Sequence, residues 1–374
     1  MTDKQKQQPK ALPAVLCLTD ACDRPETELF IGLKRAGFDV DVMCNPQGRN
    51  YQRLVDENMV VQPMAVKSRF DKDGIAAIRK QLNTKKYDII HAYNPRALAC
   101  GLQASKGTEI KVVAYRGVIG NVSFLNPESW ITFLHPRVSK IVCVADAIKD
   151  FFSSLKFLWL RVPASKLIRI YKGHDLSWYQ AEPADLTQFG VPAGAFVVCS
   201  TGRNNPRKGY DILIDAVSKL PADVQVHLVL VGDAIDNAEL QAQVSQSAHP
   251  DRVHFTGYRN DAPAIAAASD VFVLPSTERE GLPRAVIEAM AYGVAPIVSH
   301  VGGMPELVEK GVSGLVVPPK DAAALGAAIE QLYRNPELTK QFGQAAQARI
   351  ENHFHTSQTV RETSELYRSL LGSH

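Results

Sequence analysis

The chain alternates between two hydrophobic patterns along most of its length. Short continuous apolar runs, typical of buried strands, are separated by longer segments whose apolar residues recur with helical spacing. In the first half, strands are predicted at 14–19, 39–44, 87–92, 111–115 and 140–144. Strands that alternate with helices predict a parallel sheet with helices on both faces.

The same alternation restarts after a polar stretch at residues 176–192, which carries two prolines. A second set of strands is predicted at 196–201, 225–231, 253–257, 271–275, 295–299 and 314–317. Helices are predicted between them, for example at 210–219 and 322–333, and a last one at 357–371.

The chain length of 374 residues exceeds the size at which one hydrophobic core keeps growing, so two domains are expected. We expect residues 1–178 to form a first doubly wound domain and residues 179–356 a second, with a helix in 357–374 that packs back on the first. Two such domains that face each other across a cleft bind ligands at the carboxyl ends of their strands.

Composition is that of an ordinary globular protein. Hydrophobic residues make up 45% and charged residues 22%, and the net charge of +3 is too small to indicate nucleic-acid binding. No apolar run reaches transmembrane length, and residues 1–10 are polar and lack the apolar core of a signal peptide, so we expect a cytoplasmic protein. The six cysteines form no C-x-x-C pair, and we expect them to be reduced thiols in the core.

The segment Ser276–Pro296 carries the most specific chemistry. Its Gly-Leu-Pro turn follows a predicted buried strand and opens a helix, whose first N–H groups lack partners and can bind an anion. Glu280 precedes the turn, and Glu288 lies two helical turns further on. The helix dipole alone favours an acid such as Glu280 near a helix start. Glu288, in contrast, has apolar neighbours, and a carboxylate there needs a partner such as a ligand hydroxyl.

A basic loop follows the first strand of the second half, with Arg203, Arg207 and Lys208 close together. Most charge clusters of this kind are solvated surface. This loop and the Glu280 turn, however, follow strands of the same predicted sheet and therefore emerge at the same edge. Cations bind phosphates and carboxylates bind hydroxyls, so the two loops together predict a site for a sugar attached to a nucleoside diphosphate. Gly232, after the next strand, would let the backbone approach the nucleoside.

These motifs resemble the GT-B-fold retaining glycosyltransferases of family 4, also called group 1. The resemblance is close over residues 170–320 and looser elsewhere. It rests on the segments Gly202–Arg203, Lys208–Gly209, Val231–Asp233, Phe255–Gly257, Glu280–Pro283, Glu288–Gly293, Val301–Glu306 and Gly311–Pro318.

The resemblance implies roles for the matching residues. Arg203 and Lys208 would bind the diphosphate and stabilise the leaving group as its negative charge develops. Glu280 would contact hydroxyls of the donor sugar close to the reacting carbon, and Glu288 would hold the ribose hydroxyls.

Further members of the donor site follow from the same resemblance. Backbone amides around Gly281–Pro283 would face the phosphates, and Tyr258 would border the base. The donor would be a UDP-, GDP- or ADP-sugar. Transfer would retain the anomeric configuration through front-face attack, and it would need no metal and no other cofactor.

The first half departs from the family. Many relatives carry a glycine pair after the first strand, where this chain has Asp20, and His-Gly after a later strand, where it has Arg116-Gly117. Asp20 is a candidate proton acceptor. Arg116 would bind an anionic acceptor or a donor phosphate, or else it is a surface arginine paired with a carboxylate. The common Asn-Gly-x-Asp turn is altered to Lys172–Asp175.

Residues 137–172 hold eight lysines and arginines but only two acids, interleaved with aromatic residues. This composition suits contact with an anionic membrane, and a lipid-linked acceptor in lipopolysaccharide or glycolipid synthesis would follow. The alternative is a helix that packs on the core and has a solvated edge.

Three other functions stay open. One is a sugar-phosphate synthase of the same fold, for which Arg116 would bind the phosphorylated acceptor. The others are a non-catalytic nucleotide-sugar binding protein and a nucleic-acid binding protein. The complete set of Arg203, Lys208, Glu280 and Glu288 argues against loss of chemistry.

Overall fold

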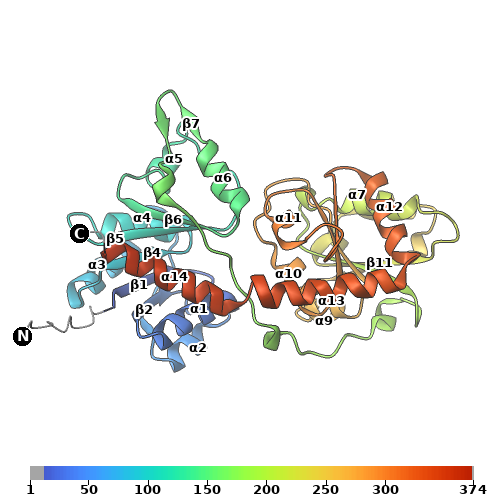
Figure 1. Ribbon diagram of the computed structural model, residues 1–374, viewed down its shortest axis with the longest axis horizontal. Helices are drawn as coiled ribbons and strands as arrows, with labels where there is room; N and C mark the ends of the chain where they lie inside the picture. The colour runs from blue at the N-terminus through green and yellow to red at the C-terminus, as the bar shows by residue number, and fades with distance from the viewer. Residues whose placement is uncertain (1–11, 373–374) are drawn as a thin grey trace, which may run out of the picture.

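Two parallel sheets, one in each half of the chain, organise the structure, a computed structural model in which residues 12–372 are described (Figure 1). The predicted polar tail at residues 1–10 lies outside the described residues. Within 12–372, no helix combines the length and the apolar character that crossing a bilayer requires. Both sheets confirm the doubly wound architecture expected from the sequence.

The first sheet has the strand order β3-β2-β1-β4-β5-β6-β9 and is parallel throughout. Its strands are β1 (Ala14–Thr19), β2 (Asp39–Cys44), β3 (Val60–Pro63), β4 (Ile89–Ala92), β5 (Lys111–Arg116), β6 (Val138–Cys143) and β9 (Leu167–Arg169). The helices of this half are α1 (Arg24–Arg35), α2 (Tyr51–Asp56), α3 (Lys72–Thr84), α4 (Pro95–Ala104), α5 (Pro127–Trp130) and α6 (Asp146–Ser154). A separate antiparallel hairpin, β7 (Lys156–Phe157) and β8 (Leu160–Arg161), follows α6.

The second sheet has the order β12-β11-β10-β13-β14-β15 and is also parallel. Its strands are β10 (Phe196–Thr201), β11 (Val226–Val231), β12 (Val253–Gly257), β13 (Val271–Leu274), β14 (Ala295–Ser299) and β15 (Leu315–Val317). The helices are α7 (Tyr210–Ser218), α8 (Ala238–Ser245), α9 (Ala262–Ala267), α10 (Arg284–Ala291), α11 (Met304–Leu307), α12 (Ala322–Tyr333) and α13 (Pro336–His353).

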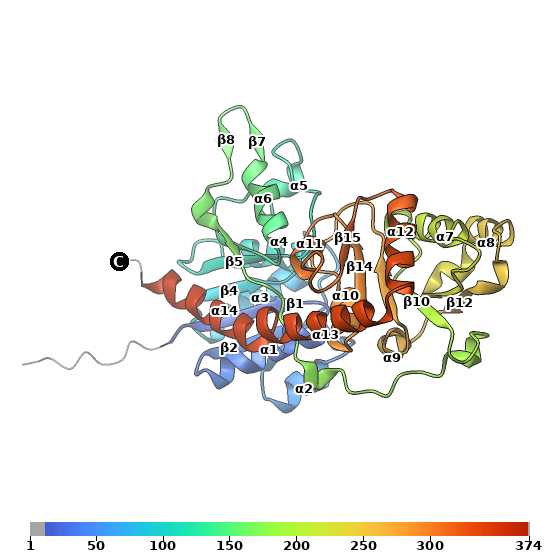
Figure 2. The same ribbon diagram turned by 45° about the vertical axis from the view of Figure 1, so that its right-hand side comes forward.

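The central strands are buried on both faces, which explains their continuous apolar runs. All four residues of β13 are buried, as are all five of β14. Helices lie on both sides of each sheet (Figures 1 and 2). All six cysteines are buried free thiols, as predicted.

The last helix, α14 (Thr356–Leu371), leaves the second domain and packs on α1 of the first, as predicted. Its Tyr367 is fully buried, stacks edge-on against Phe38 with ring centroids 5.8 Å apart, and lies with its hydroxyl 2.8 Å from Nδ1 of His91 in β4. The chain therefore crosses between the domains twice.

Burial of His91 makes the free energy of unfolding depend on pH. Burial lowers the pKa of His91 to about 3, whereas an exposed histidine titrates near 6.5. The unfolded chain therefore gains a proton below about pH 6.5 that the folded state refuses until about pH 3. The stability present above pH 6.5 is lost as the pH falls through this window.

We expect His91→Gln, which keeps a polar side chain, to lose less stability than the wild type between pH 6.5 and pH 4. The slope of the unfolding free energy against pH should differ between His91→Gln and wild type by up to about 1.4 kcal/mol per pH unit. Urea unfolding at several pH values measures it, with the exposed His300 changed to Gln as the control. Parallel curves for His91→Gln and wild type would contradict the prediction.

Candidate active site

A cleft of about 980 Å³ lies between the carboxyl ends of the two sheets. Strand order reverses between β1 and β4 in the first sheet and between β10 and β13 in the second. Loops that leave neighbouring strands at such a reversal run to opposite faces of the sheet, which opens a crevice for a ligand. The loops after β10 and β13 are the two that the sequence singled out.

These two loops are joined to each other. The backbone N–H of Thr277 donates to the carbonyl oxygen of Arg207 over 2.8 Å. Gly209 ends the first loop with a positive φ of 69°, and a Cβ there would lie 2.3 Å from the carbonyl oxygen of Pro275. Only glycine permits both this conformation and this approach.

The contact brings together Lys208 and Glu280, as the sequence predicted. Lys208 Nζ lies 2.8 Å from Glu280 Oε1, and Ser276 Oγ donates to the same oxygen over 2.7 Å. Arg279, just before Glu280, has a φ of 60°, which is uncommon for a residue other than glycine. The side chain of Glu280 is 14% exposed, so its carboxylate is largely shielded from solvent and lies next to the polar groups of Lys208 and Ser276.

Glu288 lies on the second turn of α10 and also lines the cleft. Burial raises the pKa of its carboxyl group, and the nearby cations Arg284 and Arg49 counteract the rise. Arg284 Nε is 3.2 Å from Glu288 Oε1. The four-residue spacing of this pair is a helical signal that sequence reasoning overlooked.

Most predicted donor-site residues line the same cleft. They are Arg203, Lys208, Gly232, Tyr258, Glu280, Leu282, Pro283 and Glu288. Arg203 is exposed and has no hydrogen-bond or ion-pair partner among residues 12–372. Its guanidinium is therefore available for an anion in the cleft.

Gly281 lies at one of the contacts between the two domains. A Cβ on Gly281 would lie 2.0 Å from the carbonyl oxygen of Gly117, which follows β5 in the first domain. The second domain therefore packs backbone to backbone against the first beside Glu280.

The structure places Arg116 and Asp20 away from the predicted acceptor role. Arg116 is only 7% exposed, donates to the carbonyl oxygens of Val118 and Gly120, and stacks on Phe133. Burial lowers its pKa to about 10. The guanidinium therefore holds the 117–120 loop and is neither a free anion site nor a surface residue paired with a carboxylate.

Asp20 accepts a hydrogen bond from Val66 N at 3.3 Å and pairs with Arg96 at 3.3 Å. It is not among the residues that line the cleft. Its carboxylate instead ties the end of β1 to the loop after β3 and to the first turn of α4.

A different set of polar groups forms the first-domain wall. Lys172 pairs with Asp23 and lies 3.3 Å from Glu26 Oε1. Burial pulls the pKa of Lys172 down, but Tyr115, Glu26 and Asp23 outweigh it and raise the pKa above its usual value. A lysine in the altered Lys172–Asp175 turn is thus matched by two carboxylates near the start of α1.

Polar contacts join the two domains at two further places, and sequence reasoning missed both. Arg49 Nη2 donates to the hydroxyl of Tyr258 over 2.9 Å. The carboxylate of Glu306 accepts from the backbone N–H groups of Asp146 and Ala147, at 2.7 and 2.8 Å. Glu306 of the second domain therefore caps the N-terminus of α6 in the first.

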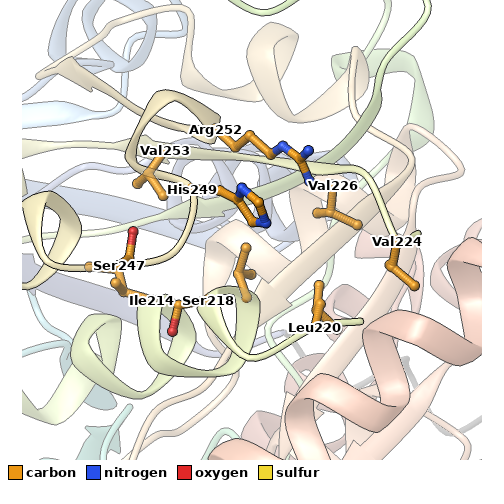
Figure 3. A pocket seen from close by; sticks show the side chains of 10 residues that line it. Ile214, Ser218, Leu220, Val224, Val226, Ser247, His249, Arg252 and Val253 are labelled. Carbon is orange, nitrogen blue, oxygen red and sulfur yellow. The ribbon is translucent and has the colours of Figure 1, made fainter. Parts of the chain in front are cut away.

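A second hollow lies beside α7 and is shown in Figure 3. Its volume of about 10 Å³ leaves room for about one water molecule, so it is no binding site for an organic ligand. Across the described part of the chain, no three His, Cys, Asp or Glu side chains are placed to hold a metal ion.

Comparison with known families decides the identity. Residues 182–349 match the family described as Glycosyl transferases group 1, and residues 27–178 match Glycosyltransferase Family 4. The chain belongs to the group 1, family 4 glycosyltransferases. The family predicted from the sequence motifs is thereby confirmed.

Solved structures agree with this assignment. The glycosyltransferase superimposes with a TM-score of 0.75 on Anabaena Alr3699/HepE in complex with UDP, at 26% identity, over 95% of this chain and 100% of that one. The predicted GT-B fold is confirmed.

Two relatives have names that refer to lipopolysaccharide or to a lipid-linked substrate. The glycosyltransferase is 32% identical over 189 residues to the lipopolysaccharide core biosynthesis glycosyltransferase LpsE of Rhizobium meliloti, which covers 50% of this chain and 53% of LpsE. It spans only about half the length of that relative. It is 24% identical over 376 residues, 95% of each chain, to UDP-Gal:alpha-D-GlcNAc-diphosphoundecaprenol alpha-1,3-galactosyltransferase of Escherichia coli.

Proposed function

We propose that the protein transfers a sugar from a nucleoside-diphosphate donor to a hydroxyl group of a saccharide or lipid-linked acceptor. The observation that carries the proposal is the Lys208–Glu280 pair at the strand-order reversal, with Arg203 and Glu288 in the same cleft. Arg203 and Lys208 bind the diphosphate, Glu280 binds the donor sugar, and Glu288 binds the ribose.

The donor-binding wall is completed by Gly232, by the backbone of Gly281–Pro283 and by Tyr258 beside the base. Names of related proteins favour uridine, since HepE is described in complex with UDP and with UDP-glucose and the Escherichia coli relative uses UDP-Gal. We therefore propose a UDP-sugar as the donor.

The chemistry breaks the bond between the anomeric carbon and the phosphate oxygen and forms one to the acceptor oxygen. Arg203 and Lys208 stabilise the negative charge that develops on the departing diphosphate. We propose that they replace a divalent metal in this role. In the structure the Lys208 ammonium is paired with Glu280, so donor phosphate competes with that carboxylate for it.

Attack from the same face as the departing phosphate retains the anomeric configuration, and it places the acceptor hydroxyl beside a phosphate oxygen that can take its proton. Retention therefore requires no carboxylate as proton acceptor, and Asp20 is not needed in that role. A sugar-phosphate synthase is less well supported, because Arg116 is committed to backbone carbonyls. A cytoplasmic location stays a prediction.

The ribose contact gives a direct test. We expect Glu288→Gln to weaken UDP binding by about 10- to 100-fold, because a hydrogen bond to a charged group contributes roughly 1.5–3 kcal/mol. The same substitution should change the affinity for a 2′,3′-dideoxy analogue of UDP little, because this analogue lacks the ribose hydroxyls. Isothermal titration calorimetry measures both.

Glu330→Gln is the matched control, because Glu330 also pairs with an arginine four residues away on a helix but lies outside the cleft. Equal losses for UDP and its dideoxy analogue would contradict the ribose role. The donor site itself would be refuted if no nucleoside diphosphate or nucleotide sugar raised the melting temperature of the wild type.

A further inference from the structure

The hairpin β7–β8 exposes apolar side chains at its tip. Leu158 and Trp159 form the two-residue turn and are 68% and 81% exposed, and Phe157 beside them is 39% exposed. The hairpin extends from the end of α6 away from both sheets in both views (Figures 1 and 2). Contiguous exposed apolar residues of this size mark a surface that meets a partner.

The backbone of the turn adopts a conformation that is unfavourable for one of its residues. Leu158 has a φ of 52°, a conformation that glycine or asparagine adopts more readily in a hairpin turn. A large apolar side chain therefore occupies a position where local backbone chemistry favours a small or polar one.

Positive charge lies one step behind the tip. Lys156 and Arg161 are directly opposed across the hairpin, and neither has an ion-pair partner among residues 12–372. Like charges placed opposite each other destabilise an antiparallel pair. An anionic surface would relieve this repulsion.

Part of the basic stretch 137–172 is used inside the protein. Lys172 pairs with Asp23 and Glu26, Arg169 lies near Asp146 and Glu362, and Phe152 is fully buried in the core. For these residues the structure fits the alternative of a segment packed on the core. The exposed apolar and cationic groups are concentrated on the hairpin, residues 156–161.

We propose that the hairpin 156–161 docks the first domain on an anionic lipid bilayer. Leu158, Trp159 and Phe157 enter the boundary between headgroups and acyl chains, where tryptophan is favoured, and Lys156 and Arg161 contact lipid phosphates. The inference rests on the proposed function in one respect, since it implies an acceptor held in or at that bilayer.

The proposal is tested by co-sedimentation of the full chain with vesicles. We expect wild type to bind phosphatidylglycerol vesicles at low salt and to be released by high salt, with little binding to pure phosphatidylcholine. The double variant Leu158→Ser/Trp159→Ser should bind about tenfold or more weakly, because each buried CH₂ group contributes to anchoring. The double variant Lys156→Gln/Arg161→Gln should lose a comparable amount of vesicle binding, and its binding should depend less on salt than that of wild type.

Matched controls lie in the second domain. Val312→Ser removes an apolar side chain that is 53% exposed, and Lys310→Gln/Lys320→Gln removes two exposed cations. Both should bind vesicles like wild type. Since the hairpin tip is outside the cleft, its variants should keep the wild-type melting temperature and its rise with UDP.

Three outcomes would overturn the proposal: no binding of wild type to anionic vesicles, equal binding by hairpin variants and wild type, or a lipid-free dimer that only the hairpin variants abolish. The last outcome would assign the tip to a second copy of the chain. If the wild type bound no nucleotide, the donor site would be refuted, and the result with vesicles would be unaffected.

Discussion

Lys208→Met is expected to lower kcat by about two to three orders of magnitude, which is the usual cost of removing one preorganised group that stabilises a developing charge. The lysine ammonium is the cation held closest to Glu280, at 2.8 Å, and its interaction strengthens as the diphosphate leaves. Because this interaction grows in the transition state, kcat should fall more than KM rises. Steady-state kinetics with a UDP-sugar measures the change.

Two comparisons separate this effect from general damage. Lys219→Met removes an exposed lysine that pairs with Asp215 in the same domain, and it should keep wild-type rates. Lys208→Met leaves the carboxylate of Glu280 with Ser276 as its hydrogen-bond donor, so a small drop in melting temperature is expected. The double variant Lys208→Met/Glu280→Gln should lose less than the sum of the single losses, because the two side chains act as a unit. A kcat for Lys208→Met within about threefold of wild type would refute the assigned role, since one preorganised donor is worth far more.

Gly281→Ala is expected to lower turnover by about 100-fold while both domains stay folded. The added methyl would lie 2.0 Å from the carbonyl oxygen of Gly117, so the domains must separate locally to admit it. A displacement of about 1 Å beside the reacting groups costs on the order of 100-fold in rate. Kinetics should be combined with small-angle scattering, in which the variant should have the larger radius of gyration.

The control for this variant is Gly372→Ala, where a Cβ would meet its nearest neighbour at an ordinary 3.4 Å. UDP binding by Gly281→Ala should persist, because the other donor residues belong to the second domain alone. If Gly281→Ala unfolded at a much lower temperature, the contact would be part of the folding core and no longer only a contact between domains.

The buried strands could be predicted from the sequence because both of their faces are covered. β1, β2, β10 and β14 begin and end where the apolar runs do, and so does β12, an edge strand whose residues are half-buried. β3 was missed because it alternates between half-buried and exposed positions, and the three-residue strand β9 was missed as well. The long helix α13 was missed because its buried residues are few for its 18 positions.

The donor side of the site was predictable for a topological reason. Loops after neighbouring parallel strands must share an edge, so Lys208 and Glu280 could be placed together without coordinates. No such rule connects Arg49 with Tyr258, which are 209 residues apart, or Lys172 with Glu26, 146 residues apart. Arg49 and Tyr258 meet because the two domains pack, whereas Lys172 and Glu26 meet because the first domain folds. Neither contact left a local pattern in the chain.

Arg116 shows the opposite error. Its position at the end of β5, where many relatives carry a histidine, indicated a ligand contact, but its side chain donates to the carbonyl oxygens of Val118 and Gly120. Side-chain direction at a strand end depends on the following loop.

The two crossings between the domains are hydrogen-bonded to each other. His174 N donates to the carbonyl oxygen of Phe354 over 2.7 Å, and Thr356 N donates to that of His174 over 2.9 Å. Two hydrogen-bonded chain segments act as a hinge. The domains can rotate about the axis along these segments, whereas rotation about other axes, or sliding of one segment along the other, would break the hydrogen bonds. Opening of the cleft is thereby reduced to one principal degree of freedom. A substitution at the junction of α13 and α14 would change how wide the cleft opens although it touches neither donor nor acceptor.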